Sequence, residues 1–334
     1  MLDPAAAVAH LAARGLLSAS ELGADPPAAH RIPGRNLLFR IDRRDAAPLL
    51  LKRAVDEETR RGLEREARAY DRITSCADPA LVRGVPSKRD YEPESATLVL
   101  DFCQGFRSLA PVRNGWSRLK APVASALGHL IARYHDLPAP TANAAPPWIL
   151  ELVHPPVGIL REATRSQLEL LGNIQRSSTW RRSLTRLAEK FESRSLVHGD
   201  LRFSNVLVED VSGVRGEPHL QLIDWELAGP GDPGQDTGRV VAEILANSLR
   251  DPRESFPLLR AFWGGYVDEP RRLPTHARLD STLSWAAAAS LQIAYESAGP
   301  SLTEVPPARM LDIGRSMVER PQVWIERVFS PDAE

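Results

Sequence analysis

The feature that most constrains the fold is a polar loop enclosed by short apolar segments. The loop reads His198-Gly-Asp200-Leu-Arg-Phe-Ser-Asn205, so one carboxylate is followed five residues later by one carboxamide. The apolar residues before it (195–197) and after it (206–208) predict strands, and a strand–loop–strand unit can direct both polar side chains into one cleft. A third predicted strand, 220–223, delivers Asp224, which we expect to lie next to this loop.

Length and composition describe an ordinary globular protein. The 334 residues suffice for two lobes, and a formal net charge of -1 argues against a broad surface for nucleic acid or acidic lipid. Only Cys76 and Cys103 are present, which excludes a disulfide framework and offers no zinc spacing. Residues 1–23 lack the pattern of a secretory signal, and no apolar run is long enough for a bilayer. We therefore expect a cytoplasmic protein with no nucleic-acid or membrane partner.

The first third of the chain predicts a small sheet with one inserted helix. Apolar residues recur at helical spacing from Val8 to Leu17, with Gly15 near the helix end, and a loop follows at 25–29. The next residues predict the order β-β-α-β-β. The predicted strands are 37–41, 49–52, an edge strand within 86–91, and 97–102, and the helix is 56–73.

After Gly105 the pattern becomes mainly helical. The predicted elements are a helix at 123–135, a Pro/Ala-rich connection at 137–148, mostly helical structure at 150–192, and helices with proline-marked breaks at 237–329. A turn at Ser212-Gly213 separates the two strands that follow the polar loop. We therefore divide the chain into an N-terminal lobe, residues 1–102, and a C-terminal lobe, residues 103–334.

The side chains on and beside the polar loop suit phosphoryl transfer. Carboxylate and carboxamide oxygens are ligands that Mg²⁺ prefers. Phosphoryl transfer needs charge neutralisation, in-line positioning and a group that takes the hydroxyl proton, and little covalent chemistry. We expect Asp200 to accept or orient that proton, and Asn205 and Asp224 to hold metal ions that bridge the phosphates. Alone, Asp200 and Asn205 could be ordinary turn residues; the flanking strands and Asp224 favour the functional interpretation.

The loop resembles the protein-kinase catalytic loop, His-Arg-Asp-Leu-x-x-x-Asn, with Gly199 in place of the arginine. That glycine, with Ile223-Asp224-Trp225-Glu226 in place of Asp-Phe-Gly, resembles the aminoglycoside phosphotransferase and choline kinase group over residues 30–245. The resemblance implies an α+β, bilobal protein-kinase-like fold with a small antiparallel-sheet N-lobe holding one helix and a larger, mainly helical C-lobe. It also implies ATP and Mg²⁺ as cofactors.

The resemblance places nucleotide-binding residues in the N-terminal lobe. Lys52 ends an apolar strand and matches the lysine that pairs with the α- and β-phosphates. We expect its partner on the following helix to be Glu66, with Glu64 as the alternative. Further nucleotide-binding candidates belong to the phosphate-covering loop and to the hinge at 98–103, whose backbone could read adenine: Gly34, Asn36, Asp101 and Cys103.

Three residues near the loop have two interpretations each. His198 is a catalytic candidate, but its place before Asp200 favours bracing of the loop over action as a base. Glu226 either binds a second metal ion or stays solvated. Asp236 matches an aspartate that follows the metal-binding aspartate in this group, and we expect it to support the catalytic loop rather than to contact ATP.

The acceptor is less constrained than the phosphate donor. Residues 251–334 contain twelve acidic residues and nine arginines, which is too mildly acidic to predict a pocket for a polycation. A choline-type acceptor would need an aromatic cage, and four aromatic residues are available, although their spacing fits helix cores equally well. They are Trp263, Tyr266, Trp285 and Tyr295.

A narrower resemblance favours a peptide acceptor. The segment Pro33-Gly-Arg-Asn-Leu-Leu-Phe-Arg40, with Leu50-Leu-Lys52 and Ser290-Leu-Gln-Ile-Ala-Tyr-Glu296, resembles stand-alone kinases of some lanthipeptide pathways, of a class V-like type. Such kinases phosphorylate Ser or Thr of a ribosomally made precursor peptide, and a partner lyase eliminates the phosphate. We expect this acceptor and partner ahead of two alternatives: a small-molecule kinase for an aminoglycoside, amino alcohol or sugar, and a catalytically silent pseudokinase acting as a binding subunit.

Overall fold

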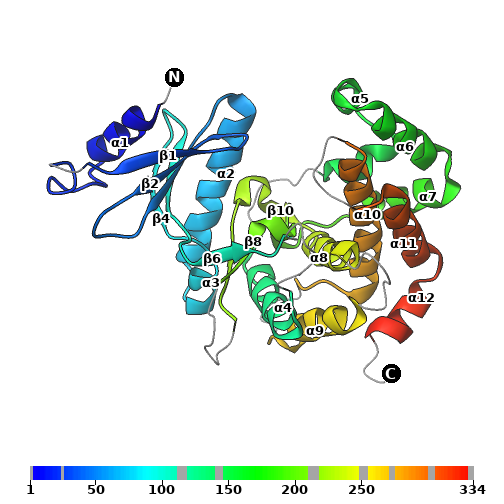
Figure 1. Cartoon of the computed structure of the whole chain (residues 1–334). Helices are drawn as coiled ribbons and strands as arrows, with labels where there is room; N and C mark the ends of the chain where they lie inside the picture. Colours follow the sequence, from blue (N-terminus) through cyan, green and yellow to red (C-terminus); the bar gives the residue numbers. More distant parts are fainter. Residues whose placement is uncertain are drawn as a thin grey trace. The chain divides into compact units, whose positions relative to one another are not determined.

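The structure is a computed structural model that describes residues 3–23, 26–110, 119–139, 146–209, 218–247, 255–270, 275–299 and 305–329. The chain forms two compact units. Unit 1 comprises residues 1–108, 207–215 and 219–228, and unit 2 comprises residues 109–206, 216–218 and 229–334. Unit 1 holds the small antiparallel sheet and unit 2 most of the helices, which confirms the predicted fold class (Figure 1). The functional division of the chain after residue 102 stays a prediction.

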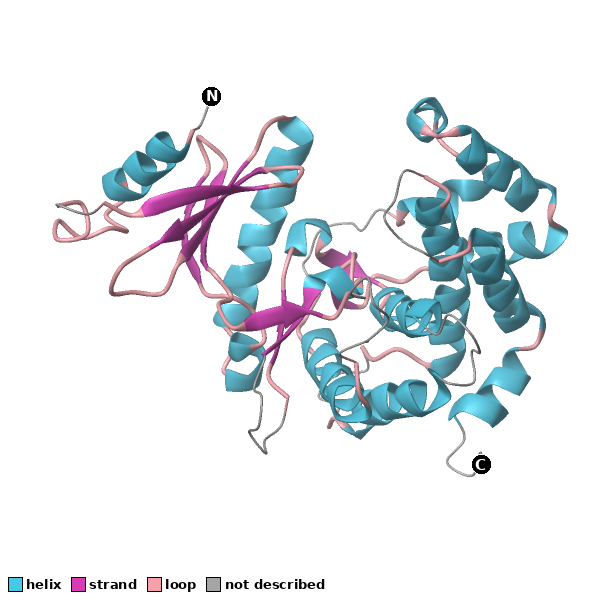
Figure 2. Ribbon diagram, in the orientation of Figure 1, coloured by secondary structure: helices cyan, strands magenta, loops and turns pink. Residues whose placement is uncertain are grey.

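A five-stranded antiparallel sheet forms the centre of unit 1 (Figure 2). Its strands lie in the order β1 (Ala28–Ile32), β2 (Leu37–Asp42), β3 (Leu49–Arg53), β5 (Thr97–Asp101) and β4 (Lys88–Glu92). The four predicted strands are all present, and the predicted edge strand β4 lies at an edge. The sequence did not predict β1, because Ala28 and Ala29 were expected in a loop. Pairing with β2 along its whole length makes this segment a strand despite its weak pattern.

Alternation along β3 directs its side chains to the two faces of this sheet. One face packs against α1 (Pro4–Ala13), which ends short of the predicted Leu17. Lys52 points to the opposite face, which α2 (Glu57–Thr74) covers. The apolar cluster on the α1 side contains Ala7, Leu11, Leu17, Phe39, Ile41, Leu49, Leu51 and Val99.

The other elements of unit 1 are short. They are α3 (Pro79–Arg83), the 3-10 turn η3 (Trp225–Leu227) and a three-stranded sheet with the order β6 (Phe106–Ser108), β8 (Val206–Glu209) and β9 (Leu220–Leu222). Strands β8 and β9 were predicted, whereas α3 and β6 were not. The predicted turn at Ser212-Gly213 lies outside the described residues.

Unit 2 is mainly helical, as predicted (Figure 2). Its longer helices are α4 (Ala121–His135), α6 (Arg165–Arg176), α7 (Ser178–Glu189), α8 (Gly234–Asn247), α9 (Phe256–Asp268), α10 (Leu279–Ser297) and α11 (Pro307–Glu319). Shorter segments are η1 (Trp148–Val153), α5 (Val157–Glu162), η2 (Phe203–Asn205), α12 (Pro321–Trp324) and the π turn η5 (Ile325–Phe329). None of the described helices combines the length and the apolar character needed to cross a bilayer.

Two glycines allow α4 and α9 to pack closely. A Cβ at Gly128 would lie 2.2 Å from the carbonyl oxygen of Phe262, and a Cβ at Gly265 would lie 2.2 Å from that of Ser125. Neither distance is compatible with a side chain, so both glycines are needed for this approach. Elsewhere in unit 2, the strands β7 (Ser195–Val197) and β10 (Gly229–Gly231) pair antiparallel, and β7 leads directly into the polar loop.

Candidate active site

Lys52 forms a buried ion-pair cluster in unit 1 with Glu66 and Asp224. Its Nζ lies 2.9 and 3.0 Å from the carboxylate oxygens of Glu66 and 2.9 Å from Oδ1 of Asp224. Tyr70 donates its hydroxyl to Oε1 of Glu66 at 3.1 Å. Of the two glutamates considered from the sequence, Glu66 is fully buried and contacts the lysine. Glu64 is half-buried, its side chain is 44% exposed, and it pairs with Arg68 of its own helix.

Burial and neighbouring charges shift the pKa values of this cluster in opposite directions. Burial lowers the pKa of Lys52, but Glu66 and Asp224 outweigh burial and hold that pKa above its ordinary value. Burial raises the pKa of Glu66, and Lys52 opposes this only in part. One ammonium group faces two carboxylates, so the ionised cluster carries excess negative charge that suits an additional cation.

The local sequence explains how these groups meet. A capping box between Asp56 and Thr59 starts α2, and Glu66 lies on the same buried helix face as Thr59. Asp224 lies two residues after the end of β9 and has left-handed backbone angles, φ 67° and ψ 57°. That conformation costs a non-glycine residue about 1–2 kcal/mol. The buried Trp225 anchors the turn by donating its indole N–H to a carbonyl oxygen of β9 at 3.0 Å.

Glu226 lies beside α2 in the same unit. A Cβ at Gly62 would lie 3.4 Å from its carboxylate, and Arg65 donates to its carbonyl oxygen at 2.8 Å. Burial and the charge of Asp224 raise the pKa of Glu226. These contacts place its carboxylate in the field of Asp224, while its action as a metal ligand stays a prediction.

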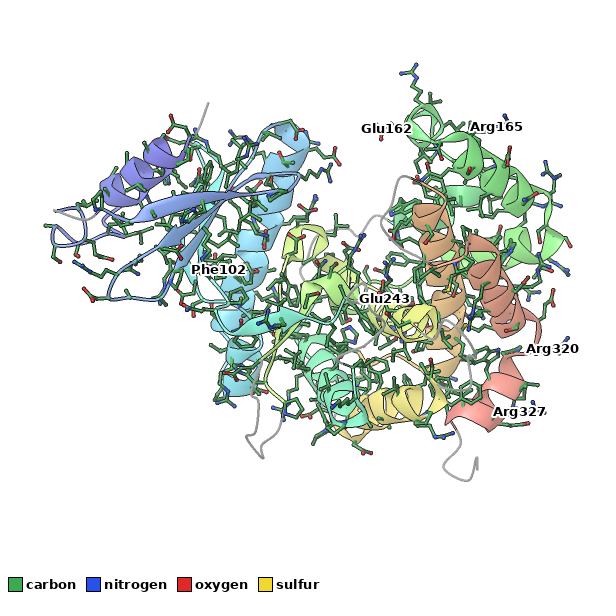
Figure 3. All side chains as sticks on the ribbon, in the orientation of Figure 1. Phe102, Glu162, Arg165, Glu243, Arg320 and Arg327 are labelled. Atoms are coloured by element: carbon green, nitrogen blue, oxygen red, sulfur yellow. The ribbon has the colours of Figure 1, made fainter. Side chains whose placement is uncertain are left out.

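A cavity of about 670 Å³ lies beside Lys52 within unit 1. Asp101 and Cys103 line it, whereas Gly34 and Asn36 do not. Phe102, labelled in Figure 3, also lines it, and the guanidinium of Arg40 lies 4.7 Å from the centre of its ring. The apolar lining further includes Leu50, Leu100, Leu207 and Ile223.

The two hinge candidates offer different groups to this cavity. Both carboxylate oxygens of Asp101 accept hydrogen bonds from Arg89, at 2.6 and 2.7 Å. Burial, aided by the charge of Asp101, raises the pKa of Cys103 to about 11, so its thiol is protonated at neutral pH. The backbone N–H of Cys103 donates to no acceptor in the described part of the chain. The hinge therefore presents a backbone donor rather than a free side-chain carboxylate.

In unit 2 the polar loop is held by Asp236. His198 and Gly199 donate their backbone N–H groups to its two carboxylate oxygens, at 2.7 and 3.1 Å. His135 lies 3.3 Å from the same carboxylate and contacts the hydroxyl of Tyr266 at 2.8 Å through its other ring nitrogen. Burial opposes ionisation of Asp236, but His135 and the loop donors outweigh it and hold its pKa below the ordinary value.

Within the loop, Asp200 and Asn205 contact each other. Nδ2 of Asn205 donates to the carbonyl oxygen of Asp200 at 2.9 Å and lies 3.4 Å from its Oδ2. His198 accepts the backbone N–H of Asp200 through Nδ1 at 3.3 Å. This contact agrees with the expected bracing of the loop, and the role of His198 stays a prediction. Unit 2 thus brings together Asp200, Asn205, His198 and Asp236, the four residues that the sequence assigned to this loop and its support.

A series of alternating charges, which the sequence analysis missed, continues from Asp200. Nε and Nη2 of Arg202 lie 3.0 and 2.9 Å from Oδ1 of Asp200, and Nη2 lies 3.4 Å from Glu296. Glu296 pairs with the buried Arg239 at 3.3 Å, and Arg239 pairs with Glu243 at 2.8 Å (Figure 3 labels Glu243). Arg202 occupies a variable position of the motif and Glu296 lies on α10, so only the fold reveals the connection.

Arg239 also faces a small cavity beside Asp200. The cavity measures about 30 Å³ and has polar lining from Asp200, Gln235, Asp236, Arg239 and Gln292. Nη1 of Arg239 is buried and makes no hydrogen bond to a described residue. A buried donor of this kind requires an acceptor, so a water molecule or a ligand oxygen in the cavity would complete it.

The four aromatic residues considered for a cage do not gather in one place. Trp263 stacks on Tyr266 at 5.4 Å between ring centres, Trp285 contacts Phe191 at 6.3 Å, and Tyr295 contacts Trp148 at 5.8 Å. These are three separate pairs within helix packing. An aromatic cage built from the four residues is therefore not formed.

No group of three His, Cys, Asp or Glu side chains arranged for a metal ion occurs among the described residues. Of the predicted ligands, Asp224 and Glu226 belong to unit 1 and Asn205 belongs to unit 2. Their joint action on a metal ion stays a prediction.

Residues 31–275 match the family model described as the phosphotransferase enzyme family. The chain belongs to this family. The match includes Lys52, the polar loop and Asp224, and it confirms the predicted relationship to aminoglycoside phosphotransferases and choline kinases. The predicted enzyme class is confirmed as well: the protein is a kinase. A comparison with curated protein sequences gives no match.

Solved structures of kinases have the same fold. A microcompartment-associated aminopropanol kinase is 15% identical, with a TM-score of 0.56, covering 95% of this chain and 98% of that one. The choline kinase LicA from Streptococcus pneumoniae is 11% identical, with a TM-score of 0.53, covering 92% and 99%. The macrolide 2'-phosphotransferase MphH from Brachybacterium faecium is 18% identical, with a TM-score of 0.50, covering 95% and 98%.

Proposed function

We propose that this kinase moves the γ-phosphate of ATP to a hydroxyl group of its acceptor, with Mg²⁺ as the metal. The observation that carries the proposal is the buried ion-pair cluster of Lys52, Glu66 and Asp224 beside a cavity of about 670 Å³. A cation fixed by two carboxylates beside a largely apolar cavity suits a ligand with an aromatic base and a charged phosphate chain.

On the donor side, Lys52 would contact the phosphates and Glu66 would hold it in position. The base would enter the apolar part of the cavity. There the N–H of Cys103, which has no acceptor among the described residues, supports recognition by the backbone. Gly34 and Asn36 would cover the phosphates from the β1–β2 connection. In this proposal residues 1–102 form the nucleotide-binding lobe, and residues 103–334 carry the catalytic loop and the acceptor site.

The side chains present fit Mg²⁺. In this proposal Asp224 and Glu226 would offer carboxylate oxygens and Asn205 a carboxamide oxygen, and all are hard donors. Lys52 contacts Oδ1 of Asp224, and the side chain of Asp224 is 36% exposed, which would let a metal ion reach this carboxylate. When bound, the metal ion would neutralise charge that develops on the phosphates.

Asp200 would accept the proton of the acceptor hydroxyl. The hydroxyl oxygen then bonds to the γ-phosphorus, and the bond from that phosphorus to the β–γ bridging oxygen breaks to release ADP. Arg202 holds Oδ1 of Asp200, which leaves Oδ2, 3.4 Å from Asn205, to face the acceptor. Asp236 and His198 would act indirectly, by fixing the backbone that carries Asp200.

For the acceptor we propose Ser or Thr of a ribosomally made precursor peptide, with elimination of the phosphate by a partner lyase. The support is the resemblance of the segment 290–296 to peptide-pathway kinases, together with its position. Within this segment, Gln292 lines the small cavity beside Asp200 and Glu296 pairs with Arg202. The side chains that carry the resemblance therefore lie next to the proposed proton acceptor.

A small-molecule alcohol is the second candidate. Its support is the set of similar structures, whose names describe kinases of aminopropanol, choline and macrolides. Arg239 lines the small cavity beside Asp200, and its positive charge is unfavourable for a polycation. If the acceptor is a small molecule, a neutral or singly charged alcohol is therefore favoured.

The deciding experiment offers the purified protein ATP, Mg²⁺ and either a candidate precursor peptide or a panel of small alcohols. Mass spectrometry should detect one added phosphate group on Ser or Thr of the peptide. Phosphorylation of alcohols but never of peptide would select the second candidate. Asp200→Asn should lower turnover by at least ~100-fold. Turnover close to that of the wild type would remove Asp200 from its proposed role.

A further inference from the structure

Helices α7, α10 and α11 pack together in unit 2 (Figure 1). A basic groove lies where they meet. Its volume is about 400 Å³. One wall is formed by Arg182 and Arg186 of α7 and by Lys190, which caps the C-terminus of this helix. The remaining lining is Thr179, Ser183 and Leu187 of the same wall, Leu283 and Ser284 of α10, Met317, Val318 and Glu319 of α11, and Pro321. None of these residues belongs to the polar loop or to its charged neighbours.

The three cations have no carboxylate partner in the described part of the chain. Arg182 donates only to the carbonyl oxygen of Ser178, at 3.3 Å, and neither Arg186 nor Lys190 forms an ion pair with a described residue. Among the described residues, Glu319 is the one acidic residue that lines the groove, and it accepts a hydrogen bond from Thr179 at 3.3 Å. Because the whole chain has a net charge of -1, this wall is a local excess of positive charge.

The spacing of the cations limits what can bind them together. They recur every four residues, so they rise by about 6 Å per step and span about 12 Å along α7. One phosphate group is too small to contact both ends. In an extended peptide, alternate residues point to the same side and are about 6.6 Å apart, which matches the step between the cations.

We propose that this groove binds an acidic segment of a partner polypeptide, with carboxylates on alternate residues facing Arg182, Arg186 and Lys190. The intervening apolar side chains would contact Val318 and Pro321 across the groove. This inference goes beyond the proposed function and does not depend on which hydroxyl receives the phosphate, because the groove is separate from the small cavity beside Asp200.

The test uses fluorescein-labelled peptides and fluorescence anisotropy with the full chain at 0.1 M salt. The probe repeats Glu-Leu four times, and its partner peptide repeats Gln-Leu four times. The acidic probe should bind, and its affinity should fall as salt rises, because exposed charges are screened beyond about 10 Å at this ionic strength. The Gln-Leu peptide should bind at least tenfold more weakly.

The variant Arg182→Glu/Arg186→Glu should weaken binding of the acidic probe at least tenfold. The matched control is Arg181→Glu, an exposed position on the same helix that does not line the groove, and it should change affinity less than twofold. ATP turnover of both variants reports that the protein is folded. No binding of the acidic probe, equal binding of the Gln-Leu peptide, or an equal loss in the control variant would each overturn the proposal.

Discussion

The substitution Asp236→Asn tests how the catalytic loop is held. In the wild type, one buried carboxylate accepts the backbone N–H groups of His198 and Gly199 at 2.7 and 3.1 Å and contacts His135 at 3.3 Å. Asparagine has nearly the same shape but one oxygen instead of two. Its amide NH₂ cannot accept a hydrogen bond, so one of the two loop donors would lose its partner.

The loss of stability in Asp236→Asn can be estimated from these contacts. A hydrogen bond to a charged group contributes about 1.5–3 kcal/mol, and a buried donor left without a partner costs about 1–3 kcal/mol. We therefore expect the free energy of unfolding to fall by about 3–5 kcal/mol, the range for disruption of a buried charged network. The control is Asp280→Asn on α10, where an exposed carboxylate pairs with the exposed Arg278 and loss of this pair should cost less than about 1 kcal/mol.

The pH dependence separates a charge effect from a packing effect. The folded-state pKa of Asp236 is below its ordinary value, so its stabilisation is complete above the ordinary pKa and is lost as pH falls through the lower folded value. The stability gap between wild type and Asp236→Asn should stay constant from neutral pH to about pH 5 and narrow only below about pH 4. Urea unfolding followed by circular dichroism measures it. A gap below about 1 kcal/mol at pH 7 would refute the reasoning.

Three further perturbations follow from the contacts of single residues. Glu66→Gln leaves Lys52 with a weakened partner, so calorimetry should show ATP binding weakened at least about tenfold; unchanged binding would contradict the proposed role. Arg202→Met should lower turnover about tenfold with ATP affinity unchanged, and Arg202→Lys should restore part of it, because the arginine orients Asp200. Gly128→Ala should destabilise by about 1–3 kcal/mol in thermal unfolding, whereas Gly158→Ala, which has open space, should be neutral.

Sequence patterns predicted the helices and strands whose own residues show a clear hydrophobic periodicity. The alternation of 49–52 and the amphipathic face of 56–73 predicted β3 and α2, and the same two patterns place Lys52 opposite Glu66. Strand β1 has no such pattern. Its residues are mostly exposed, and its pairing with β2 depends on backbone groups that every sequence shares. The hydrophobic pattern of the sequence therefore could not predict a strand that is held mainly by backbone hydrogen bonds.

Sequence patterns also do not show contacts between segments that are far apart in the chain. The residues proposed for the acceptor side depend on such contacts more than those proposed for ATP. On α10, Gln292 and Glu296 are one helical turn apart, and two polar residues at this spacing are typical of a solvated helix face. In the fold, however, Glu296 lies 3.4 Å from Arg202 and 3.3 Å from Arg239. Glu296 is one of the acidic residues counted in 251–334. Its charge is already paired with Arg202 and Arg239, so it is not available to a cationic acceptor. Composition therefore overstates the attraction of this region for a cationic acceptor, and the contacts around Asp200 argue against a polycation more strongly than the sequence did.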